Sequence, residues 1–398
     1  MNIVEINTCD YGSTGKIMLR IAKKARENGN IVFTFSRKWI HQPQPSEGHD
    51  YFGYFIENAL HKILAKVTGF SECFSYFGTK RLINKIKKIN PDIIHLHNLH
   101  GCYINLPLLF KYIKKNNTAV VWTFHDCWNF TGHCPHFDMI GCDKWKSLCF
   151  DCPQYKNYPK SLFDNSKVMY RLKSKWFKGI KNLTVVTPSK WLGDLVKQSF
   201  LKDYPVKVIN NGINLSVFKP TESNFRKKYC ITEFKKIILG VAFGWSDSKG
   251  LDVFIKLSKR LDDRFQIVLV GTNETVDKRL PENIISIHRT QNQAELAEIY
   301  TAADLFVNPT KEENYPTVNM ESLACGTPVL TFNTGGSPEI PDSSCGSVVP
   351  KEDIDAMYGE IIRICGTNPY SKSACTERAR NFEENNKYQS YLDLYNSL

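Results

Sequence analysis

The sequence predicts an α/β protein of two Rossmann-like, doubly wound parallel-sheet domains that face a cleft. Three observations support this fold class. The chain has 398 residues, which suits two domains of roughly 150–200 residues each. Short apolar runs alternate with amphipathic segments, as in repeated βαβ units. The composition is 42% hydrophobic and 23% charged, which fits a folded globular protein and argues against a disordered one.

Two series of short apolar runs predict the strands, one series for each domain. The first series is Ile3–Ile6, Ile31–Phe35, Ile93–His97, Val120–Phe124, Leu183–Val186 and Val206–Ile209. The second series is Ile237–Ala242, Gln266–Val270, Ile284–Ile287, Leu305–Val307, Pro328–Thr331 and Ser347–Val349. Gly212–Pro220 lies between the two series and is predicted to be the linker. We therefore expect an N-terminal domain at 1–215, a C-terminal domain at 216–375, and a C-terminal helix at 376–398 that packs back on the N-terminal domain.

The positive charge of the chain is concentrated in its first half. The whole chain carries +12, and residues 1–200 contain 29 Lys and Arg against 14 Asp and Glu, a net +15. Residues 201–398 contain 23 against 26, a net −3. This asymmetry predicts an anionic partner for the N-terminal half, either a membrane surface or nucleic acid. A solvated surface that keeps the protein soluble is the alternative interpretation.

The region from Tyr51 to Ile89 combines aromatic and basic residues on predicted amphipathic helices. Its members are Tyr51, Phe52, Tyr54, Phe55, Phe70, Phe74, Tyr76, Phe77, Lys80, Arg81, Lys85, Lys87 and Lys88. This combination predicts contact with an anionic membrane surface, and packing in a core is the alternative. No apolar run approaches the roughly 18–20 residues that span a bilayer. We therefore expect a cytoplasmic protein, bound peripherally at the inner face of the plasma membrane.

The segment Phe306–Ile340 is the most informative part of the sequence. An apolar strand is followed by a polar loop, and a helix begins near Pro316, a residue that fits a first turn. We expect Thr317, Val318 and Asn319 to present free backbone N–H groups at the N-terminus of this helix. Such a position binds a diphosphate well.

Two glutamates of the same segment predict a sugar-binding site. Glu313 lies just before the helix and Glu321 lies about one turn inside it. Both can therefore reach one ligand, one contacting the hydroxyls of a sugar and the other a ribose, because a carboxylate accepts hydrogen bonds from neighbouring hydroxyls. The Gly335-Gly336 pair then predicts a tight turn close to the ligand.

These motifs together resemble the large family of retaining glycosyltransferases known as glycosyl transferases group 1, with its E-x7-E motif and two-domain GT-B fold. The family includes bacterial polysaccharide and mannosyl transferases. VINNGINLSVF (Val208–Phe218) is similar to its linker V-x-N-G-[VI]-D-x-x-x-F, with Asn214 where Asp is usual. YTAADLFVNPT (Tyr300–Thr310) is similar to its Y-x-x-A-D-x-F-V-x-P-S strand. The resemblance covers nearly the whole chain, and E-x7-E becomes specific only in this context.

The resemblance implies a hexosyltransferase that uses a UDP- or GDP-linked sugar and requires no cofactor for catalysis. The implied acceptor is a lipid-linked glycan or polysaccharide, in the biosynthesis of a cell-surface polysaccharide such as capsule or lipopolysaccharide. Glu313 would position the donor sugar and Glu321 would bind the nucleotide. Retention in this family is assigned to departure and attack on one face, without a protein nucleophile.

The phosphate-binding loop departs from the family pattern. The family uses R-x4-K-G, and this chain has GWSDSKG, in which Lys249 and Gly250 match but Gly244 stands where arginine is expected. A lysine binds phosphate as a point charge, without the two-pronged contact of arginine. Either Trp245 reshapes the loop or another cation, for which we name Arg289, replaces the arginine.

Two further candidates follow strands of the N-terminal domain. Gly12 and Gly15 in YGSTGK follow the first strand and resemble the family's glycine-rich loop, although a plain βα turn would look the same. His125 ends another strand and matches the family histidine that contacts the donor sugar; a structural histidine is the alternative. His95 and His97 are predicted on one face of a strand, where packing is favoured over a metal site.

Four cysteines form a separate cluster in an insert at residues 133–153. Cys134, Cys142, Cys149 and Cys152 have the spacing C-x7-C-x6-C-x2-C, which predicts a structural zinc site, with His133 or His136 as substitute ligands. Buried or paired thiols and a redox role are the alternatives.

Two other functions of the whole protein remain as alternatives to a glycosyltransferase. A basic, zinc-containing nucleic-acid-binding protein would explain the charge and the cysteines but would leave Glu313–Gly336 without a role. A sugar-nucleotide epimerase of the same architecture is a second alternative. We expect no nucleic-acid partner.

Overall fold

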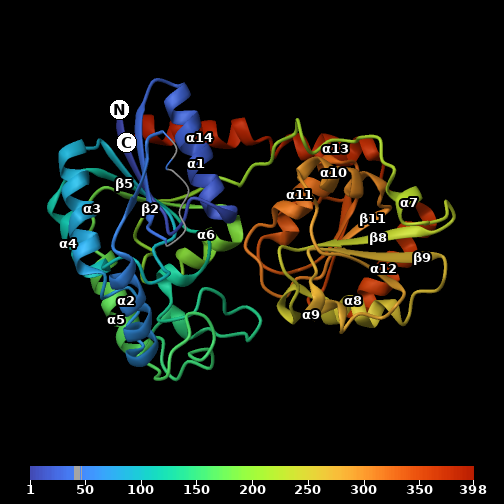
Figure 1. Ribbon diagram of the computed structural model, residues 1–398, viewed down its shortest axis with the longest axis horizontal. Helices are drawn as coiled ribbons and strands as arrows, with labels where there is room; N and C mark the ends of the chain where they lie inside the picture. The colour runs from blue at the N-terminus through green and yellow to red at the C-terminus, as the bar shows by residue number, and fades with distance from the viewer. Residues whose placement is uncertain (40–44, 46) are drawn as a thin grey trace. The chain divides into compact units, whose positions relative to one another are not determined.

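The computed structural model describes residues 1–39, 45 and 47–398 and divides into two compact units (Figure 1). The first unit contains Met1–Ile209 and Tyr388–Leu398, and the second contains Asn210–Lys387. Each unit is built on one parallel β-sheet with helices on both faces. The prediction of two doubly wound α/β domains is therefore confirmed.

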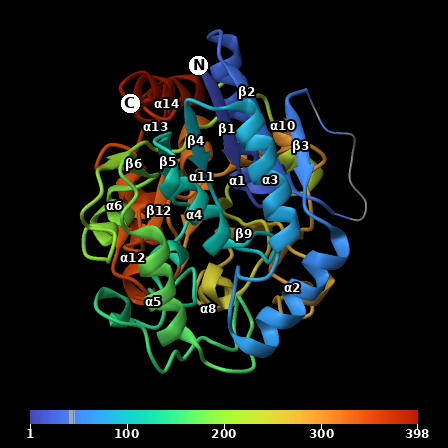
Figure 2. The same cartoon turned by 90° about the vertical axis from the view of Figure 1, so that its left-hand side faces the viewer.

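The first unit contains a seven-stranded sheet with the order β3-β2-β1-β4-β5-β6-β7. Its strands are β1 (Asn2–Ile6), β2 (Ile31–Arg37), β3 (His49–Phe52), β4 (Ile93–Leu96), β5 (Ala119–Thr123), β6 (Leu183–Thr187) and β7 (Val206–Val208). Its helices are α1 (Gly12–Glu27), α2 (Phe55–Thr68), α3 (Tyr76–Ile89), α4 (Leu106–Lys115), α5 (Ser166–Phe177), α6 (Lys190–Val196) and the larger part of α14 (Glu384–Asn396), with short 3-10 turns η1 (Trp128–Phe130) and η2 (Lys144–Lys146). Figure 2 shows this unit towards the viewer.

The second unit contains a six-stranded sheet with the order β10-β9-β8-β11-β12-β13. Its strands are β8 (Lys236–Val241), β9 (Phe265–Val270), β10 (Ile284–Ile287), β11 (Leu305–Asn308), β12 (Val329–Phe332) and β13 (Gly346–Val349). Its helices are α7 (Phe225–Lys228), α8 (Leu251–Ser258), α9 (Glu274–Asp277), α10 (Gln293–Ala302), α11 (Thr317–Ala324), α12 (Ile354–Thr367) and α13 (Lys372–Arg380), with 3-10 turns η3 (Asp247–Lys249) and η4 (Ser337–Glu339).

The central strands form because both of their faces are buried. All residues of β4, β6, β11 and β12 are buried, which explains why these strands read as continuous apolar runs. In the first unit, Ile94 belongs to the core on one face of the sheet and Ile93 to the core on the other. Within the part of the chain that the structure describes, no helix is long and apolar enough to cross a membrane.

Strand β3 was not predicted from the sequence. It begins with the polar pair His49-Asp50 and lies at the edge of the sheet, so it lacks the apolar run that marks the other strands. Tyr51 and Phe52, which we had assigned to a membrane-facing region, belong to this strand. Phe52 is buried in the core, and the Tyr51 hydroxyl donates a hydrogen bond to Asp10 Oδ2 at 2.5 Å. Core packing is therefore the correct interpretation for Phe52, whereas Tyr51 is partly buried and held by its contact with Asp10.

The division of the chain differs in detail from the expected boundaries at 215 and 375. The first unit ends at Ile209, so the predicted linker 212–220 belongs to the second unit, where Ile213 pairs with Glu383. The expected C-terminal helix 376–398 is two helices. Helix α13 lies in the second unit, whereas α14 lies in the first unit from Tyr388 onward. The two helices are separated because Phe382 turns into the core of the second unit.

Candidate active site

The sheet of the second unit has its topological switch point between β8 and β11. The chain leaves β8 towards β9 on one side and leaves β11 towards β12 on the other, so the loops after these two adjacent strands diverge. In open α/β sheets, ligands bind at this point, beyond the carboxyl ends of the strands. The predicted residues Lys249 and Glu313 lie in these two loops.

Lys249 and Glu313 are joined by an ion pair. Lys249 Nζ donates a hydrogen bond to Glu313 Oε2 at 2.8 Å, and both side chains are partly exposed. Gly250 permits this approach because its φ is +80° and a Cβ atom there would lie 2.4 Å from the carbonyl oxygen of Pro309. The sequence therefore brings a cation and a carboxylate together at the switch point.

The predicted Gly335-Gly336 turn supports the backbone that carries Glu313. Gly335 has a φ of +57°, and a Cβ atom there would lie 1.8 Å from the carbonyl oxygen of Glu313. The Gly336 N–H donates to the carbonyl oxygen of Asn314 at 2.8 Å. The turn therefore contacts the Glu313 loop itself, which explains the need for glycine at position 335.

Helix α11 begins beside Glu313 without a side-chain cap. Pro316 is its N-cap residue, and the N–H groups of Thr317 and Val318 have no acceptor among the described residues. Asn319 differs from the prediction, because its N–H donates to the carbonyl oxygen of Pro316 at 3.3 Å. The helix N-terminus therefore offers two backbone donors and the positive end of its dipole to an anion.

The Asn319 side chain has a structural role that the sequence did not reveal. It is buried, accepts a hydrogen bond from Asn308 Nδ2 at 2.8 Å, and donates to Ser337 Oγ at 2.9 Å. It therefore connects the end of β11 to the turn at η4. This bridge fixes α11 relative to the two strands that flank it.

Glu321 lies inside α11 and is oriented by a tyrosine. The buried Tyr300 hydroxyl donates to Glu321 Oε2 at 3.2 Å. The Glu321 side chain is only partly buried. Its carboxylate is therefore accessible to solvent on one side, and a carboxylate is the type of group that accepts hydrogen bonds from ribose hydroxyls.

The loop that lacks the expected arginine is anchored by Trp245. The indole Nε1 donates to the carbonyl oxygen of Val270 at 3.0 Å, and the ring packs edge-on against Phe254. A Cβ atom at Gly244 would meet no atom within 4 Å, so this position is open. The prediction that Trp245 shapes this loop is consistent with these contacts.

Two arginines of the second unit are candidates to replace the missing cation. Arg289 is exposed and follows the edge strand β10, which β9 separates from β8. Arg279 instead contacts the phosphate-binding loop directly, because its Nη2 donates to Asp247 Oδ1 at 2.8 Å. Arg279 was not predicted from the sequence. The one feature that could have indicated it is its position after β9, the strand adjacent to β8.

The first unit has its own switch point, between β1 and β4, and the glycine-rich loop lies there. Gly12 begins α1 with a φ of +68°, and nothing lies within 4 Å of a Cβ built on it. Gly15 is buried, and a Cβ there would lie 2.5 Å from the carbonyl carbon of Asp10. Gly12 is therefore required by backbone conformation and Gly15 by close packing.

His125 follows β5 and contacts His97, which follows β4. His97 Nδ1 lies 3.1 Å from His125 Nε2, and the two rings stack at 5.4 Å. Burial lowers the pKa of His125 to about 4, with smaller effects from Asp126 and His100. The imidazole is therefore neutral near pH 7, and it can accept or donate a hydrogen bond but carries no charge.

Asp126, the next residue, is held as an anion. Its Oδ2 lies 2.9 Å from His100 Nε2. Burial would raise the pKa of Asp126, but the charge and hydrogen bond of His100 outweigh it and lower the pKa to about 2. The Asp126 carboxylate is therefore ionised near pH 7, directly after the neutral His125 in the chain.

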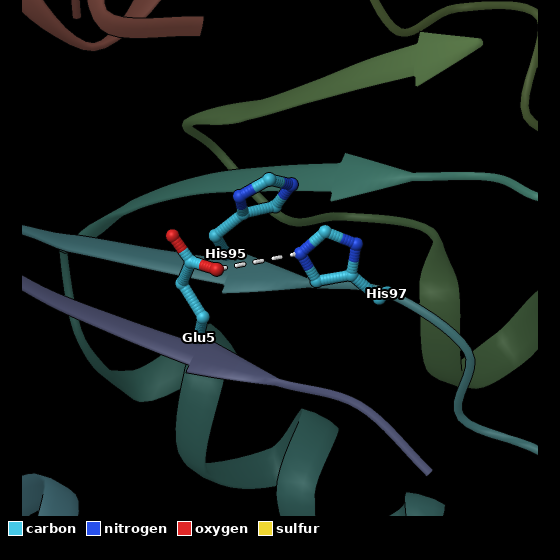
Figure 3. Close-up of side chains that lie close together, drawn as sticks. All are labelled: Glu5, His95 and His97. Carbon is cyan, nitrogen blue, oxygen red and sulfur yellow. Dashed lines mark ion pairs between the residues drawn. The ribbon is translucent and has the colours of Figure 1, made fainter. Parts of the chain in front are cut away.

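A buried polar cluster lies deeper in the first unit and is shown in Figure 3. Glu5 of β1, His95 of β4 and His97, which follows β4, point towards one another, with Glu5 Oε2 3.7 Å from His97 Nε2. Both Glu5 oxygens and His97 Nε2 have no hydrogen-bond partner among the described residues. Burial raises the pKa of Glu5 well above its ordinary value. Burial therefore favours the neutral form of this carboxyl group.

His95 connects this cluster to α14. Its Nδ1 lies 2.6 Å from the Tyr395 hydroxyl and its Nε2 lies 2.8 Å from Thr123 Oγ1. Because both ring nitrogens are already engaged, His95 has no free ligand atom to offer a metal ion. The prediction that His95 and His97 pack on one face of a strand agrees with their 4.1 Å ring separation.

The four cysteines of the insert lie around one small cavity in the first unit. Cys134, Cys142, Cys149 and Cys152 all border it, as does His133. All four are free thiols. This cluster is separate from the histidines that follow β4 and β5.

The fold defines a class of protein: a two-domain α/β protein with a topological switch point in each of its parallel sheets. The chain belongs to the glycosyltransferases. Residues 14–217 match the family described as Glycosyltransferase Family 4, and residues 235–367 match the family described as Glycosyl transferases group 1.

Similar proteins support this placement. A putative colanic acid biosynthesis glycosyl transferase, WcaC of Escherichia coli (strain K12), is 26% identical over 274 residues. The match covers 66% of this chain and 65% of WcaC, so the chain spans slightly less than two thirds of that relative. Sucrose-phosphate synthase from Thermosynechococcus elongatus has the same fold, with a TM-score of 0.72, 18% identity, and coverage of 100% and 98% of the two chains. HepE of Anabaena, solved with UDP-glucose, has a TM-score of 0.66 at 14% identity, with both chains covered completely. The two units therefore form a GT-B fold.

Proposed function

We propose that this protein is a retaining glycosyltransferase of cell-surface polysaccharide biosynthesis that transfers a sugar from a UDP- or GDP-linked donor to a lipid-linked glycan or polysaccharide. The observation that carries the proposal is the Lys249–Glu313 ion pair beside the uncapped N-terminus of α11, at the switch point of the second unit. A cation, two backbone donors and a carboxylate together suit a sugar diphosphate.

Each group of this site has a separate role towards the donor. The N–H groups of Thr317 and Val318 bind the diphosphate, and Lys249 neutralises charge that develops on the leaving group. Glu321 binds the ribose hydroxyls, and Glu313 holds hydroxyls of the donor sugar. A relative of the same fold, HepE, was solved with UDP-glucose, which favours a UDP-linked donor.

Retention follows from departure and attack on the same face of the sugar. Glu313 is paired with an ammonium group, which weakens it as a nucleophile, so we assign it to positioning the donor and not to a covalent intermediate. Neutral His125 contacts the donor sugar by hydrogen bonding. The leaving diphosphate is then stabilised by fixed dipoles and Lys249 alone.

The donor proposal is tested by measuring the slow hydrolysis of a panel of UDP- and GDP-sugars, followed by nucleotide titration. Glu321→Ala should weaken binding of UDP or GDP at least tenfold, whereas the exposed Glu377→Ala on α13 should leave it unchanged. Equal affinity in both variants would contradict the assignment of Glu321. The anomeric configuration of the product, read by proton NMR, decides between retention and inversion.

We also propose that the protein binds peripherally to a membrane surface through helix α2. A stripe of apolar side chains on α2 is exposed: Phe55, Ile56, Leu60, Ile63 and Val67. Asn58, His61 and Ala65 occupy the buried side of the same helix. This inverts the usual pattern, because the outward face is the apolar one. A stripe with this spacing suits insertion into the interface of a bilayer.

Basic residues of α3 lie beside this stripe. Lys80, Arg81, Lys85 and Lys88 line a cavity of about 400 Å³ together with Tyr54 and Phe77. Phe77 itself is 68% exposed. Aromatic and apolar side chains next to a basic cavity suit a lipid surface with anionic headgroups.

Vesicle flotation tests this surface. The wild type should float with vesicles that contain phosphatidylglycerol and much less with pure phosphatidylcholine. A triple variant, Ile56→Ser, Leu60→Ser and Ile63→Ser, should lose flotation. Phe234→Ser, which removes an even more exposed apolar residue from the second unit, should float like the wild type. Undiminished flotation of the triple variant would exclude α2 as the contact.

A further inference from the structure

Four cysteine thiols surround a space that fits one ion. The cavity between Cys134, Cys142, Cys149 and Cys152 has a volume of about 20 Å³. A site needs roughly 10–15 Å³ to hold a single water molecule. The space is therefore large enough for one ion or one water molecule and too small for an organic ligand.

The lining of the cavity suits a metal ion. Besides the four cysteines, it includes Thr131, Lys144, Phe137, Trp145 and Phe150. His133 also borders the space, and its Nε2 is buried with no hydrogen-bond partner among the described residues. Thiolate sulfur and imidazole nitrogen are the ligand atoms that structural zinc sites use.

Hydrogen bonds orient one of the thiols and the backbone between Cys149 and Cys152. The Gly132 N–H donates to Cys149 Sγ at 3.2 Å. Lys144 Nζ donates to the carbonyl oxygens of Phe150 and Asp151, both at 3.0 Å. Lys144 follows Cys142 by two residues, so this contact connects the Cys142 side of the loop to the C-x2-C turn. Donors that orient metal ligands in this way are a regular part of metal sites.

A buried lysine anchors the start of the insert. Lys173 of α5 is fully buried, and its Nζ donates to the carbonyl oxygens of Trp128 and Thr131 at 2.6 and 3.1 Å. The same Nζ lies 3.3 Å from the centroid of the Trp128 ring. These contacts fix the backbone that leads to Cys134 against α5.

The insert also lacks the secondary structure that normally holds a long segment. Between η1 and α5, residues 131–165, the only helix or strand described is the single turn η2. Loops of this length without secondary structure are uncommon in compact domains. A bound metal ion can hold such a segment in one conformation, because it links ligands that are far apart in the sequence.

We propose that Cys134, Cys142, Cys149 and Cys152 bind one structural zinc ion as four thiolates, with release of four protons. Zn–S bonds of about 2.3 Å require the sulfur atoms to lie close together. Among the described residues, two groups of three potential ligands lie within 4.8 Å of one another, Glu5–His95–His97 and His61–Glu72–Cys102. The four cysteines are not such a group, so their sulfur atoms are farther apart than in a zinc site. They must therefore move inward when the ion binds, which tightens the insert around it.

The metal content of the purified full-length chain tests the proposal. Elemental analysis should find one zinc per chain, and Cys149→Ser with Cys152→Ser should reduce it to near zero. Cys230→Ser, at an exposed thiol of the second unit, should retain one zinc. Cobalt substitution should give the sulfur-to-metal charge-transfer absorption of a tetrahedral thiolate site, and this absorption should be absent from the double variant.

A second measurement does not depend on the folding of the double variant. In native wild type, alkylation followed by peptide mass spectrometry should show these four thiols protected until a chelator removes the zinc. Three results would overturn the proposal. The first is that all four thiols react freely in the native protein, and the second is that two of them form a disulfide. The third is that the wild type contains no zinc after growth in zinc-containing medium. One zinc retained by the double variant would also overturn it, because the ion would then occupy another group.

Discussion

Lys249 Nζ donates to Glu313 Oε2 at 2.8 Å and so joins the loops that follow β8 and β11. The two residues are 64 positions apart, and their loops meet because the two strands are neighbours in the sheet. In this arrangement each charge neutralises the other. A bound diphosphate would compete for the ammonium group and leave the carboxylate free to accept hydrogen bonds from sugar hydroxyls.

Removal of the ammonium group should therefore affect transfer far more than folding. We expect Lys249→Ala to lower kcat/KM by roughly 10²–10³, since it removes a charge from the developing leaving group. The melting temperature should change little, because a partly exposed ion pair contributes only about 0–1 kcal/mol. Lys256→Ala on α8, which removes another surface ion pair, is the control. Full activity of Lys249→Ala would exclude a phosphate-binding role.

Gly335 should be intolerant of even one methyl group. Gly335→Ala places a Cβ 1.8 Å from the carbonyl oxygen of Glu313 in a left-handed conformation, so we expect a loss of stability of about 2 kcal/mol. Calorimetry should show a melting temperature lower by about 4–8 °C, together with reduced activity. Gly366→Ala in α12, where the Cβ meets nothing within 4 Å, should be neutral or stabilising. Equal behaviour of the two variants would contradict this account.

The sheets were the most predictable part of the molecule. All twelve predicted strands are present. Buried parallel strands need apolar side chains on both faces, so each of them appears in the sequence as a short apolar run. β3 was missed because an edge strand does not need such a run, and His49-Asp50 begins it. The C-terminal segment was read as one helix because its polar pattern gave no sign that Phe382 enters the core.

The sequence predicted which residues belong to the candidate site, but it did not predict which of them contact one another. Local spacing placed Glu313 before a helix and Glu321 inside it, but it could not show that Lys249 pairs with Glu313. That contact depends on the close approach of Gly250 to Pro309 across two strands. Arg279 was missed for the same reason, since nothing in its neighbourhood distinguishes it until strand order is known.

The contact between His95 and Tyr395 should account for much of the attachment of α14. Tyr395→Phe removes the hydroxyl that lies 2.6 Å from His95 Nδ1 and leaves a buried ring nitrogen without its partner. We expect a loss of about 1–3 kcal/mol in the free energy of unfolding, measured by urea titration. Tyr358→Phe on α12, whose ring is only partly buried, should change stability by less than about 0.5 kcal/mol. A Tyr395→Phe variant as stable as wild type would show that apolar packing alone holds α14.

Acid should destabilise the first unit through its buried histidines. Burial lowers the pKa of His95 to about 3 and that of His125 to about 4, and it lowers the pKa of His97 well below the ordinary value of 6.5. Between these values and 6.5 the unfolded chain binds more protons than the folded one, so stability rises with pH in this window and is lost as pH falls. Glu5 acts in the opposite direction, because its raised pKa favours the folded state as pH falls. Because three histidines lose stabilisation and one carboxyl gains it, the free energy of unfolding should decrease as the pH falls.

The share of His95 can be isolated by comparing pH profiles. Between pH 6.5 and 5.0, one fully buried histidine that stays neutral in the folded state changes stability by roughly 2 kcal/mol. His95→Gln keeps a donor and an acceptor near Tyr395 and Thr123 but does not titrate, so its unfolding free energy should fall less steeply over this interval. Urea titrations of both proteins at the two pH values give the difference directly. Parallel profiles would mean that His95 is protonated in the folded state, which its hydrogen bonds to two hydroxyl groups and its complete burial oppose.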